Sequence, residues 1–393
     1  MNPNYMMVYN QEPRMFHLPK FIESLRQVKD RRDIRGKRHK LHFVLCGVTL
    51  AILSGRSKLS SIQRYIKNRI KWLRKVTKEA DAEVISRAQL PRILSRVDRE
   101  ELNAVTMNHF GVLLIETGED EWQAIDGKAL CGTPDENGNQ KARIVTAVNH
   151  ESREIVAQCE MNSAKKGEIT VVRTFLDETG LEKANITLDA LHMNPKTTAQ
   201  IHQAGGHYLI QVKNNQSELR DALTAIAQKE TPFAIHNYTE RGHGRFEERW
   251  YWTFDIRTAD FDERWHQSGL SSLVVVMRQT TSSSDSTKIS LELSYYLSNW
   301  PLSGDNDISS DALARAVRRH WGVESINWIR DVTFQEDKVK TKDPPLAQCL
   351  ATIRSFAIRL LQQAKSPNFQ EAIERFVDCP NDFFSFLRQA YVL

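Results

Sequence analysis

The sequence has few of the features that mark secreted, zinc-binding or membrane proteins. It contains five cysteines, an odd number without a CxxC pair, so we expect reduced thiols and neither a disulfide framework nor a zinc knuckle. Its longest apolar run, residues 43–53, is about half of the roughly 20 residues that a membrane-spanning helix needs. The polar first residues lack the apolar stretch of a signal peptide. We therefore expect a cytoplasmic protein with no membrane partner.

Charge is distributed unevenly along the 393 residues. Residues 1–100 hold 23 Lys and Arg against 9 Asp and Glu, whereas residues 101–393 hold 31 against 40. The net charges of these segments are therefore +14 and −9. A basic segment joined to an acidic remainder predicts that one part binds a polyanion while the other carries carboxylate chemistry. The alternative is that the basic run is only a solvated surface.

The basic segment has helical periodicity and no strand pattern. Residues 62–73 place apolar side chains at helical spacing, which predicts one amphipathic helix with a basic face, capped by Ser60 or Ser61. A further short helix is predicted within residues 91–102. A basic amphipathic helix suits contact with DNA phosphates, which position a protein without reading sequence. The candidate contacts on this helix are Arg64, Lys67 and Lys71.

A different pattern begins at Glu121. It predicts, in chain order, three strands within 121–161, a helix at 167–180, a strand at 185–191, a helix at 197–206 and a strand at 207–215. The order β-β-β-α-β-α-β is that of a mixed α/β sheet. Residues 216 to about 300 are rich in strands, which indicates an inserted β-subdomain, and one further helix is predicted over 309–334.

Three acidic residues stand in apolar surroundings. Asp126 closes a strand at an Asp-Gly turn, and Asp189 interrupts a buried run. Glu324 lies on a helix whose apolar side chains indicate that the helix packs against another part of the protein; they are Trp321, Val323, Ile326 and Trp328. Buried carboxylates are costly unless they are paired or bind a metal, so these residues predict convergence on a cation. Oxygen ligands select Mg²⁺ or Mn²⁺, and such ions can activate water and stabilise the leaving oxygen of a phosphodiester. Each residue taken singly could instead be a turn or capping residue.

The motifs around these residues resemble the ISAs-type insertion-sequence transposases, also called H-repeat-associated proteins, of the DDE superfamily. The resemblance covers nearly the whole chain and rests on AIDGKALCG, KKGEITVV, ITLDALHMNPKTTAQIHQAGGHYLIQVKNNQSEL, GHGRFEER and RRHWGVESINWIRDVTFQED. It implies an RNase H-like mixed-sheet α/β core with a β-rich insertion, flanked by helical N-terminal and C-terminal regions. It places Asp126, Asp189 and Glu324 at the catalytic, metal-binding positions. It also implies that Mg²⁺ or Mn²⁺ supports the cutting and joining of DNA.

The expected partners are double-stranded DNA, as transposon terminal inverted repeats and target DNA, and further copies of the chain on that DNA. Bound to DNA, such a protein would be associated with the nucleoid. The expected domains are a helical DNA-binding region at 1–118, a catalytic core at 119–335 with its insertion at about 216–300, and a helical tail at 336–393. Two alternatives stay open, an inactive DNA-binding descendant of a transposase and a stand-alone metal-dependent nuclease.

Further DNA contacts are predicted near the carboxylates and in the insertion, although each could be an ordinary turn or surface residue. They are Lys128, Lys213, Asn215, Arg245 and His320. Asp331 shares a helix face with His320 and Glu324 by spacing and could approach the metal. Pairing of Asp331 with Arg330 or Lys338 is the preferred interpretation.

Overall fold

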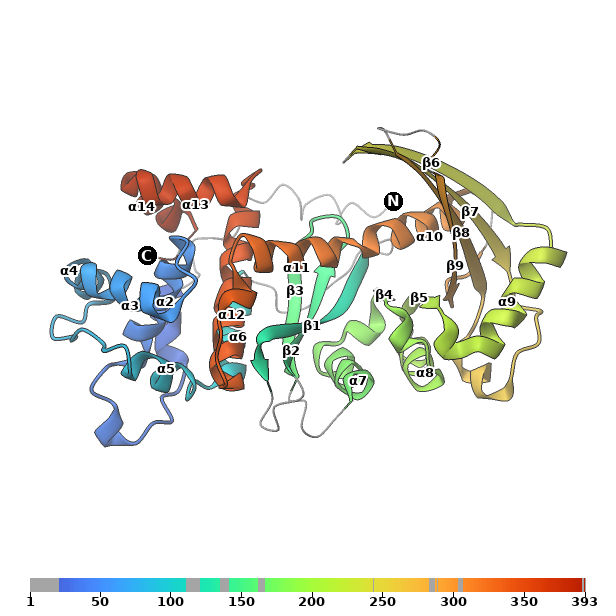
Figure 1. Cartoon of the computed structure of the whole chain (residues 1–393). Coiled ribbons are helices and arrows are strands. Elements are labelled where there is room, and N and C mark those ends of the chain that lie inside the picture. Colours follow the sequence, from blue (N-terminus) through green and yellow to red (C-terminus); the bar gives the residue numbers. More distant parts are fainter. Residues whose placement is uncertain are drawn as a thin grey trace, which may run out of the picture. The chain divides into compact units, whose positions relative to one another are not determined.

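The chain was analysed as a computed structural model (Figure 1). It describes residues 21–110, 121–134, 141–161, 167–242, 244–282, 287, 289–302, 307–390 and 392, with only the backbone at 34, 131–134, 141, 307 and 308. The chain divides into two compact units. The helical unit has the bounds 1–113, 129–143 and 328–393, and the α/β unit has the bounds 114–128 and 144–327.

The helical unit is built around two buried helices, one from each end of the chain. Its helices are α1 (Phe21–Ser24), α2 (Leu41–Leu53), α3 (Leu59–Asn68), α4 (Ile70–Thr77), α5 (Gln89–Leu94), α6 (Arg99–Asn108), α12 (Pro344–Gln363), α13 (Phe369–Asp378) and α14 (Pro380–Gln389). Nearly all side chains of α2 and those of 346–361 in α12 are buried, and α12 contacts α2, α5 and α6. Among the described helices, none combines the length and apolarity needed to cross a bilayer.

The predicted basic amphipathic helix is two helices. Arg69, with φ −110° and ψ 16°, leaves helical geometry, so that α3 ends before it and α4 begins after it. Arg64 and Lys67 therefore lie on α3 and Lys71 on α4. The prediction of a single helix was wrong because periodicity over a few turns does not register a one-residue break.

The predicted helix start was also wrong. Lys58, not Ser60 or Ser61, occupies the N-cap position of α3, and Ser61 Oγ donates to the Lys58 carbonyl oxygen at 2.7 Å. The helix predicted within 91–102 is the junction of α5 and α6. Asp98 caps α6 there, since its carboxylate accepts the Glu101 N–H at 3.1 Å.

The α/β unit confirms the predicted mixed sheet. Its elements are β1 (Trp122–Pro134), β2 (Lys141–Asn149), β3 (Ile155–Met161), α7 (Glu168–Thr179), β4 (Asn185–Leu188), α8 (Pro195–Gln203), β5 (His207–Val212), α9 (Ser217–Lys229), β6 (Ala234–Gly242), β7 (Arg245–Asp255), β8 (Ser272–Ser282), β9 (Ile289–Ser298), α10 (Asp307–His320) and α11 (Gly322–Val332). The sheet has nine strands in the order β3-β2-β1-β4-β5-β9-β8-β7-β6. β4 runs parallel to β1 and β5, and β9 pairs antiparallel with β5.

Helices cover both faces of this sheet. On one face, α7, α8 and α9 pack in a core that contains Ile210 of β5. On the other face, Leu313 of α10 packs in a core that contains Leu209. Because successive side chains of a strand point to opposite faces, neighbouring residues of β5 enter different cores. Strands β4 and β5 therefore lie between two helical layers.

The strand-rich segment from 216 to about 300 differs from its prediction in two ways. It begins with α9, a helix that the strand interpretation missed. Its strands β6–β9 form antiparallel pairs and do not make a separate sheet, because β9 continues the central sheet through β5. Figure 1 shows β6–β9 as long, curved ribbons.

Candidate active site

Two of the predicted carboxylates lie at the same level on adjacent parallel strands, Asp126 within β1 and Asp189 just after β4. Ala124 of β1 lies opposite Thr187 of β4, and Asp126 and Asp189 each follow two residues later. Residues two positions apart along an extended chain point to the same side, so this register directs both carboxylates to one edge of the sheet. The carboxyl ends of parallel strands are the usual place for ligand sites in α/β folds.

The sequence had predicted that Asp126 ends its strand, and this prediction was wrong. β1 continues to Pro134, and the predicted Asp-Gly turn is absent. Asp126 Oδ1 accepts the N–H of Gly127 at 2.8 Å. A Cβ on Gly127 would lie 2.6 Å from Glu168 Oε1, so glycine allows α7 to bring a further carboxylate against the strand. Glu168 was not among the predicted site residues.

Asp189 caps a short 3₁₀ helix, Ala190–His192. Its Oδ1 accepts the N–H of Leu191 at 3.2 Å and lies 3.7 Å from His192 Nε2. The side chain of Asp189 is 51% exposed, so the cap leaves it open to a ligand. Asn215 donates its amide N–H to the Ala190 carbonyl oxygen at 2.7 Å. Asn215, predicted as a DNA contact, therefore supports the turn that carries Asp189.

Glu324 lies in the first turn of α11, just after a break between two helices. The single helix predicted over 309–334 is α10 and α11, separated at Trp321. Val323 and Ile326 are buried, but Trp321 and Trp328 are 45% and 59% exposed. The helix therefore packs, as predicted, through Val323 and Ile326, while both tryptophans stay exposed.

Asn327 links the helix of Glu324 to Asp126. Its Nδ2–H donates to Asp126 Oδ2 at 3.0 Å, across 201 positions of sequence. Asn327 was not among the predicted site residues, although its spacing of three from Glu324 places both on one face of a helix. With the Gly127 N–H on Oδ1, each oxygen of Asp126 accepts one hydrogen bond.

Asp126 interacts electrostatically with each of the other two carboxylates. Burial and then the charge of Asp189 raise the pKa of Asp126, although its hydrogen bonds act in the opposite direction. Burial and then the charge of Asp126 raise the pKa of Glu324, whereas Lys213 lowers it. Like charges that raise each other's pKa are relieved by a bound cation. The donor set, three carboxylates, fits a hard divalent ion.

The side chains would have to turn toward one another to share one ion. Within the described ranges, no three His, Cys, Asp or Glu side chains lie close enough together to hold a metal. Asp331 was the other candidate. Burial lowers the pKa of the neighbouring Arg330 guanidinium, and the charges of Glu336 and, to a smaller extent, Asp331 oppose this shift.

Two histidines meet at Thr187, beneath the carboxylates. His320 Nδ1 lies 2.8 Å and His150 Nε2 lies 3.0 Å from Thr187 Oγ1. Burial lowers the pKa of His320 to about 4 and that of His150 to about 3, so both rings are neutral at pH 7. His320 was predicted to contact DNA, but a buried neutral ring that contacts Thr187 carries no charge for a phosphate.

The remaining predicted DNA contacts differ in environment. Lys128 is 8% exposed and lies within β1, so it is not a solvated turn residue. Lys213 is exposed beside the site, and its charge acts on both Glu324 and His320. Arg245 is exposed on β7 with its Nε 3.4 Å from Glu247 Oε1.

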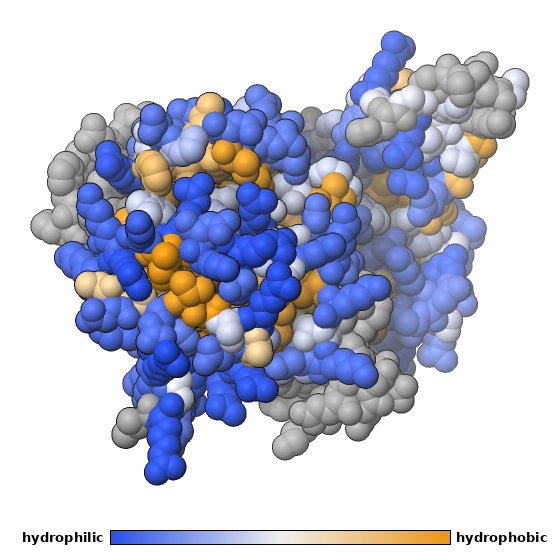
Figure 2. All heavy atoms as spheres, turned by 60° about the vertical axis from the view of Figure 1, so that its left-hand side comes forward, coloured by the Kyte–Doolittle hydropathy of each residue, from blue (hydrophilic) through white to orange (hydrophobic). Residues whose placement is uncertain are grey.

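The cations of α3 and α4 are exposed. Arg64, Lys67 and Lys71 have no ion-pair partner in the part of the chain that the structure describes. Figure 2 shows that the face of the helical unit turned toward the viewer is mostly hydrophilic, with small hydrophobic patches. These three side chains can therefore reach a polyanion without first breaking an ion pair.

Two family models match the chain. Residues 22–110 match the one described as DDE_Tnp_1-associated, and residues 119–360, more than half of the chain, match the one described as Transposase DDE domain. "Putative transposase YncI" of Escherichia coli O157:H7 is 28% identical over 348 residues, 85% of each chain. "H repeat-associated putative transposase YhhI" of Escherichia coli K12 is 24% identical over 355 residues, 88% of this chain and 92% of that protein.

Among solved structures, the chain resembles the cryo-EM structure of the piggyBac transposase synaptic complex with hairpin DNA. The TM-score is 0.45 at 11% identity, and the match covers 94% of this chain and 78% of that chain.

Proposed function

Because the chain belongs to the Transposase DDE domain family, we propose that it is a DNA transposase that cuts insertion-sequence ends and joins them to target DNA. The observation that carries this proposal is the equal level of Asp126 on β1 and Asp189 at the end of the adjacent parallel strand β4, with Glu324 electrostatically linked to Asp126. An RNase H-like core, with β6–β9 as its insertion, is the fold we propose for this site.

Asp126, Asp189 and Glu324 would hold Mg²⁺ or Mn²⁺ in this proposal. Such an ion, when bound, lowers the pKa of a coordinated water and stabilises the charge on the leaving oxygen. The chain's own residues fix the geometry. Asn327 orients the Asp126 carboxylate, and the Leu191 N–H orients that of Asp189. Exposed Lys213, beside the carboxylates, is suited to hold a phosphate oxygen of the cleaved strand.

One site can perform both cutting and joining. In cutting, the oxygen of water bonds to phosphorus and the bond to the 3′ oxygen breaks, which leaves a 3′-hydroxyl on the transposon end. In joining, that 3′ oxygen bonds to a target phosphorus, and the target's own 3′ oxygen leaves. No covalent bond to the protein is needed. Because both transposon ends must be joined to the same target DNA, we propose that a homo-oligomer assembles on DNA.

The test is a cleavage and strand-transfer assay on the DNA that flanks the coding region. The full chain with Mg²⁺ should nick this flanking DNA at the transposon ends, leave 3′-hydroxyl groups there, and join those ends to a plasmid. EDTA should stop both reactions. Asp126→Asn should bind the same DNA without cutting it. DNA binding by the wild type without any metal-dependent cutting would indicate an inactive descendant. Cutting without joining of pre-cut ends would indicate a stand-alone nuclease.

A further inference from the structure

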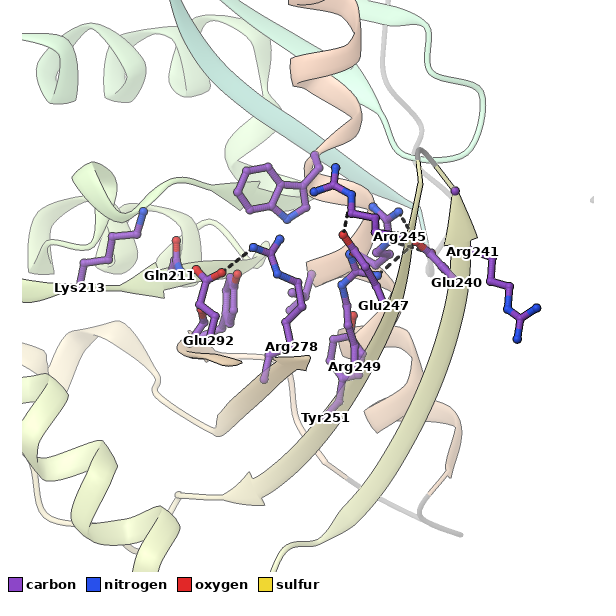
Figure 3. Close-up of a pocket in the computed structure, with 17 residues that line it drawn as sticks. Gln211, Lys213, Glu240, Arg241, Arg245, Glu247, Arg249, Tyr251, Arg278 and Glu292 are labelled. Carbon is purple, nitrogen blue, oxygen red and sulfur yellow. Dashed lines mark hydrogen bonds and ion pairs between the residues drawn. The ribbon is translucent and has the colours of Figure 1, made fainter. Parts of the chain in front are cut away.

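A groove on the face of strands β6–β9 combines arginines, glutamates and one exposed tryptophan. Its volume is about 600 Å³, and β5, β6, β7, β8, β9, α10 and Trp321 contribute to its lining. Six of the lining residues are cationic, namely Lys213, Arg241, Arg245, Arg249, Arg278 and Arg318, against the carboxylates Glu240, Glu247 and Glu292. In Figure 3 Arg241 points away from the other labelled side chains, which leaves five cations against three carboxylates.

The charged side chains of the groove hold one another in place. Glu240 accepts hydrogen bonds from Arg249 at 3.2 Å and from Arg318 at 2.7 Å, so that it links the sheet to α10. Arg278 donates to Glu292 at 2.6 Å across β8 and β9. Figure 3 shows the Arg278–Glu292 pair and, on neighbouring strands, the side chains of Arg249 and Glu240. Arginines held in this way are pre-oriented for a planar or phosphate-bearing ligand, and the excess of cations favours an anion.

Trp321 is the feature that packing does not explain. Trp321 presents a large aromatic surface with one polar N–H, and it is 45% exposed and lines a polar groove. It lies between α10 and α11, three residues before Glu324. An aromatic ring in a cationic groove is the arrangement by which proteins bind unpaired nucleotides, with bases stacked on rings and phosphates on basic side chains.

The groove continues toward the carboxylates. A second cavity of about 540 Å³ is lined by Asp189 and shares Gln211, Lys213, Glu292 and Ser294 with the groove. A volume of several hundred Å³ accommodates a ligand the size of a small molecule, such as one or two nucleotides, and not a double helix. A strand seated in the groove could thus extend past Lys213 to Asp189 as a single strand.

We propose that this groove binds unpaired nucleotides at an opened DNA end, with one base stacked on Trp321 and the phosphates held by the arginines. The proposal rests on the proposed function, and it adds that the DNA strand leaving the carboxylate site is single-stranded over one or two nucleotides.

The experiment measures DNA binding by fluorescence anisotropy with the full chain in EDTA, so that nothing is cut. The probes are a blunt duplex of about 30 base pairs and the same duplex with a tail of about four thymidines. The wild type should bind the tailed probe about tenfold more tightly than the blunt one. Trp321→Ala should lose this gain, and Trp321→Phe, which keeps a ring, should retain most of it.

The matched control is Trp328→Ala. Trp328 is more exposed than Trp321, 59% against 45%, and it is not part of the groove lining. Its removal should leave the gain unchanged. A second measurement does not depend on the variants folding. Ultraviolet crosslinking of a tail that carries 5-iodouracil, followed by mass spectrometry, should identify Trp321 in the wild type.

The outcomes separate this proposal from the proposed function. Equal binding of tailed and blunt probes, or equal loss of the gain in Trp328→Ala, overturns the groove proposal and leaves the transposase proposal intact. Crosslinking to residues outside the groove also overturns it. Failure of the full chain to bind either probe, or the segment flanking its coding region, counts against both proposals.

Discussion

The two units use positive charge in different ways. In the helical unit, residues 54–78 contain nine Lys and Arg and no Asp or Glu. In the α/β unit, each glutamate of the groove forms an ion pair with at least one arginine. Cations without carboxylate partners release counterions when they bind phosphates, whereas paired cations must first exchange their partner. Positive charge in the helical unit therefore favours affinity for phosphates, whereas positive charge in the α/β unit favours the positioning of a bound ligand.

The largest expected effect would separate chemistry from binding. Glu324→Gln keeps the shape of the side chain and removes its charge, so metal-dependent cleavage should fall by about a thousandfold or more. DNA affinity should change by less than about twofold, because the cations are untouched. Single-turnover cleavage at saturating protein and anisotropy titration measure the two effects.

Asp331→Asn is the control for that variant. Asp331 lies about 10 Å farther along the helix axis, and its charge acts on Arg330. Its cleavage rate should fall by about tenfold at most. If Asp331→Asn is inactive and Glu324→Gln retains activity, the third carboxylate has been misassigned.

The second prediction tests the free cations of the helical unit with two triple variants. One changes exposed cations without an ion-pair partner in the described ranges: Arg64→Gln, Lys67→Gln and Lys71→Gln. The control changes exposed cations that pair with Glu101, Asp98 and Glu83, respectively: Lys29→Gln, Arg31→Gln and Arg38→Gln. Only the first should lower affinity on the order of 100-fold at physiological salt and reduce the salt slope by about 2.7. Equal losses in both variants would show that pairing does not distinguish these cations.

The third prediction concerns Asn327, an uncharged residue that orients Asp126. Asn327→Ala removes the N–H that orients Asp126, and loss of such a supporting contact typically costs about 10-fold to 100-fold in metal affinity or activity. The Mg²⁺ concentration for half-maximal cleavage should rise, and calorimetric binding of Mg²⁺ should weaken, while DNA affinity stays unchanged. Ser325→Ala, at an exposed position of the same helix, is the control. An unchanged Mg²⁺ requirement in Asn327→Ala would contradict the orienting role.

Local pattern predicted much of the fold because strand and helix periods are local properties. The order from β1 to β5 followed from apolar spacing alone. The breaks at Arg69 and Trp321 did not, because each depends on how the flanking helices pack in the folded unit. Nor could the pattern show that α2 and α12, from opposite ends of the chain, share a core.

The site was predictable to a similar degree. Asp126, Asp189 and Glu324 were selected because carboxylates are costly in apolar surroundings, and their roles remain predictions. Thr187 carried no such signal, since a threonine within a strand is ordinary until His150 and His320 are brought to it by the fold. The exposure of Trp321 likewise carried no signal, because the sequence pattern grouped Trp321 with Val323 and Ile326, which are buried.

The smallest expected effect is a loss of folding stability of the α/β unit at acid pH. His150 and His320 have pKa values of about 3 and about 4 in the fold, below the roughly 6.5 of an unfolded histidine. Between the folded and the unfolded pKa values, the two histidines bind protons only in the unfolded chain. Their contribution to the free energy of unfolding is therefore fully present above pH 6.5 and is lost as the pH falls. At pH 5 the protonation of each histidine in the unfolded chain should lower the free energy of unfolding by about 2 kcal/mol. The variant His150→Gln with His320→Gln should therefore lose less stability than the wild type between pH 7 and pH 5, as measured by urea unfolding. The other histidines remain in both proteins, so an identical pH dependence would mean that this pair is not held neutral in the fold.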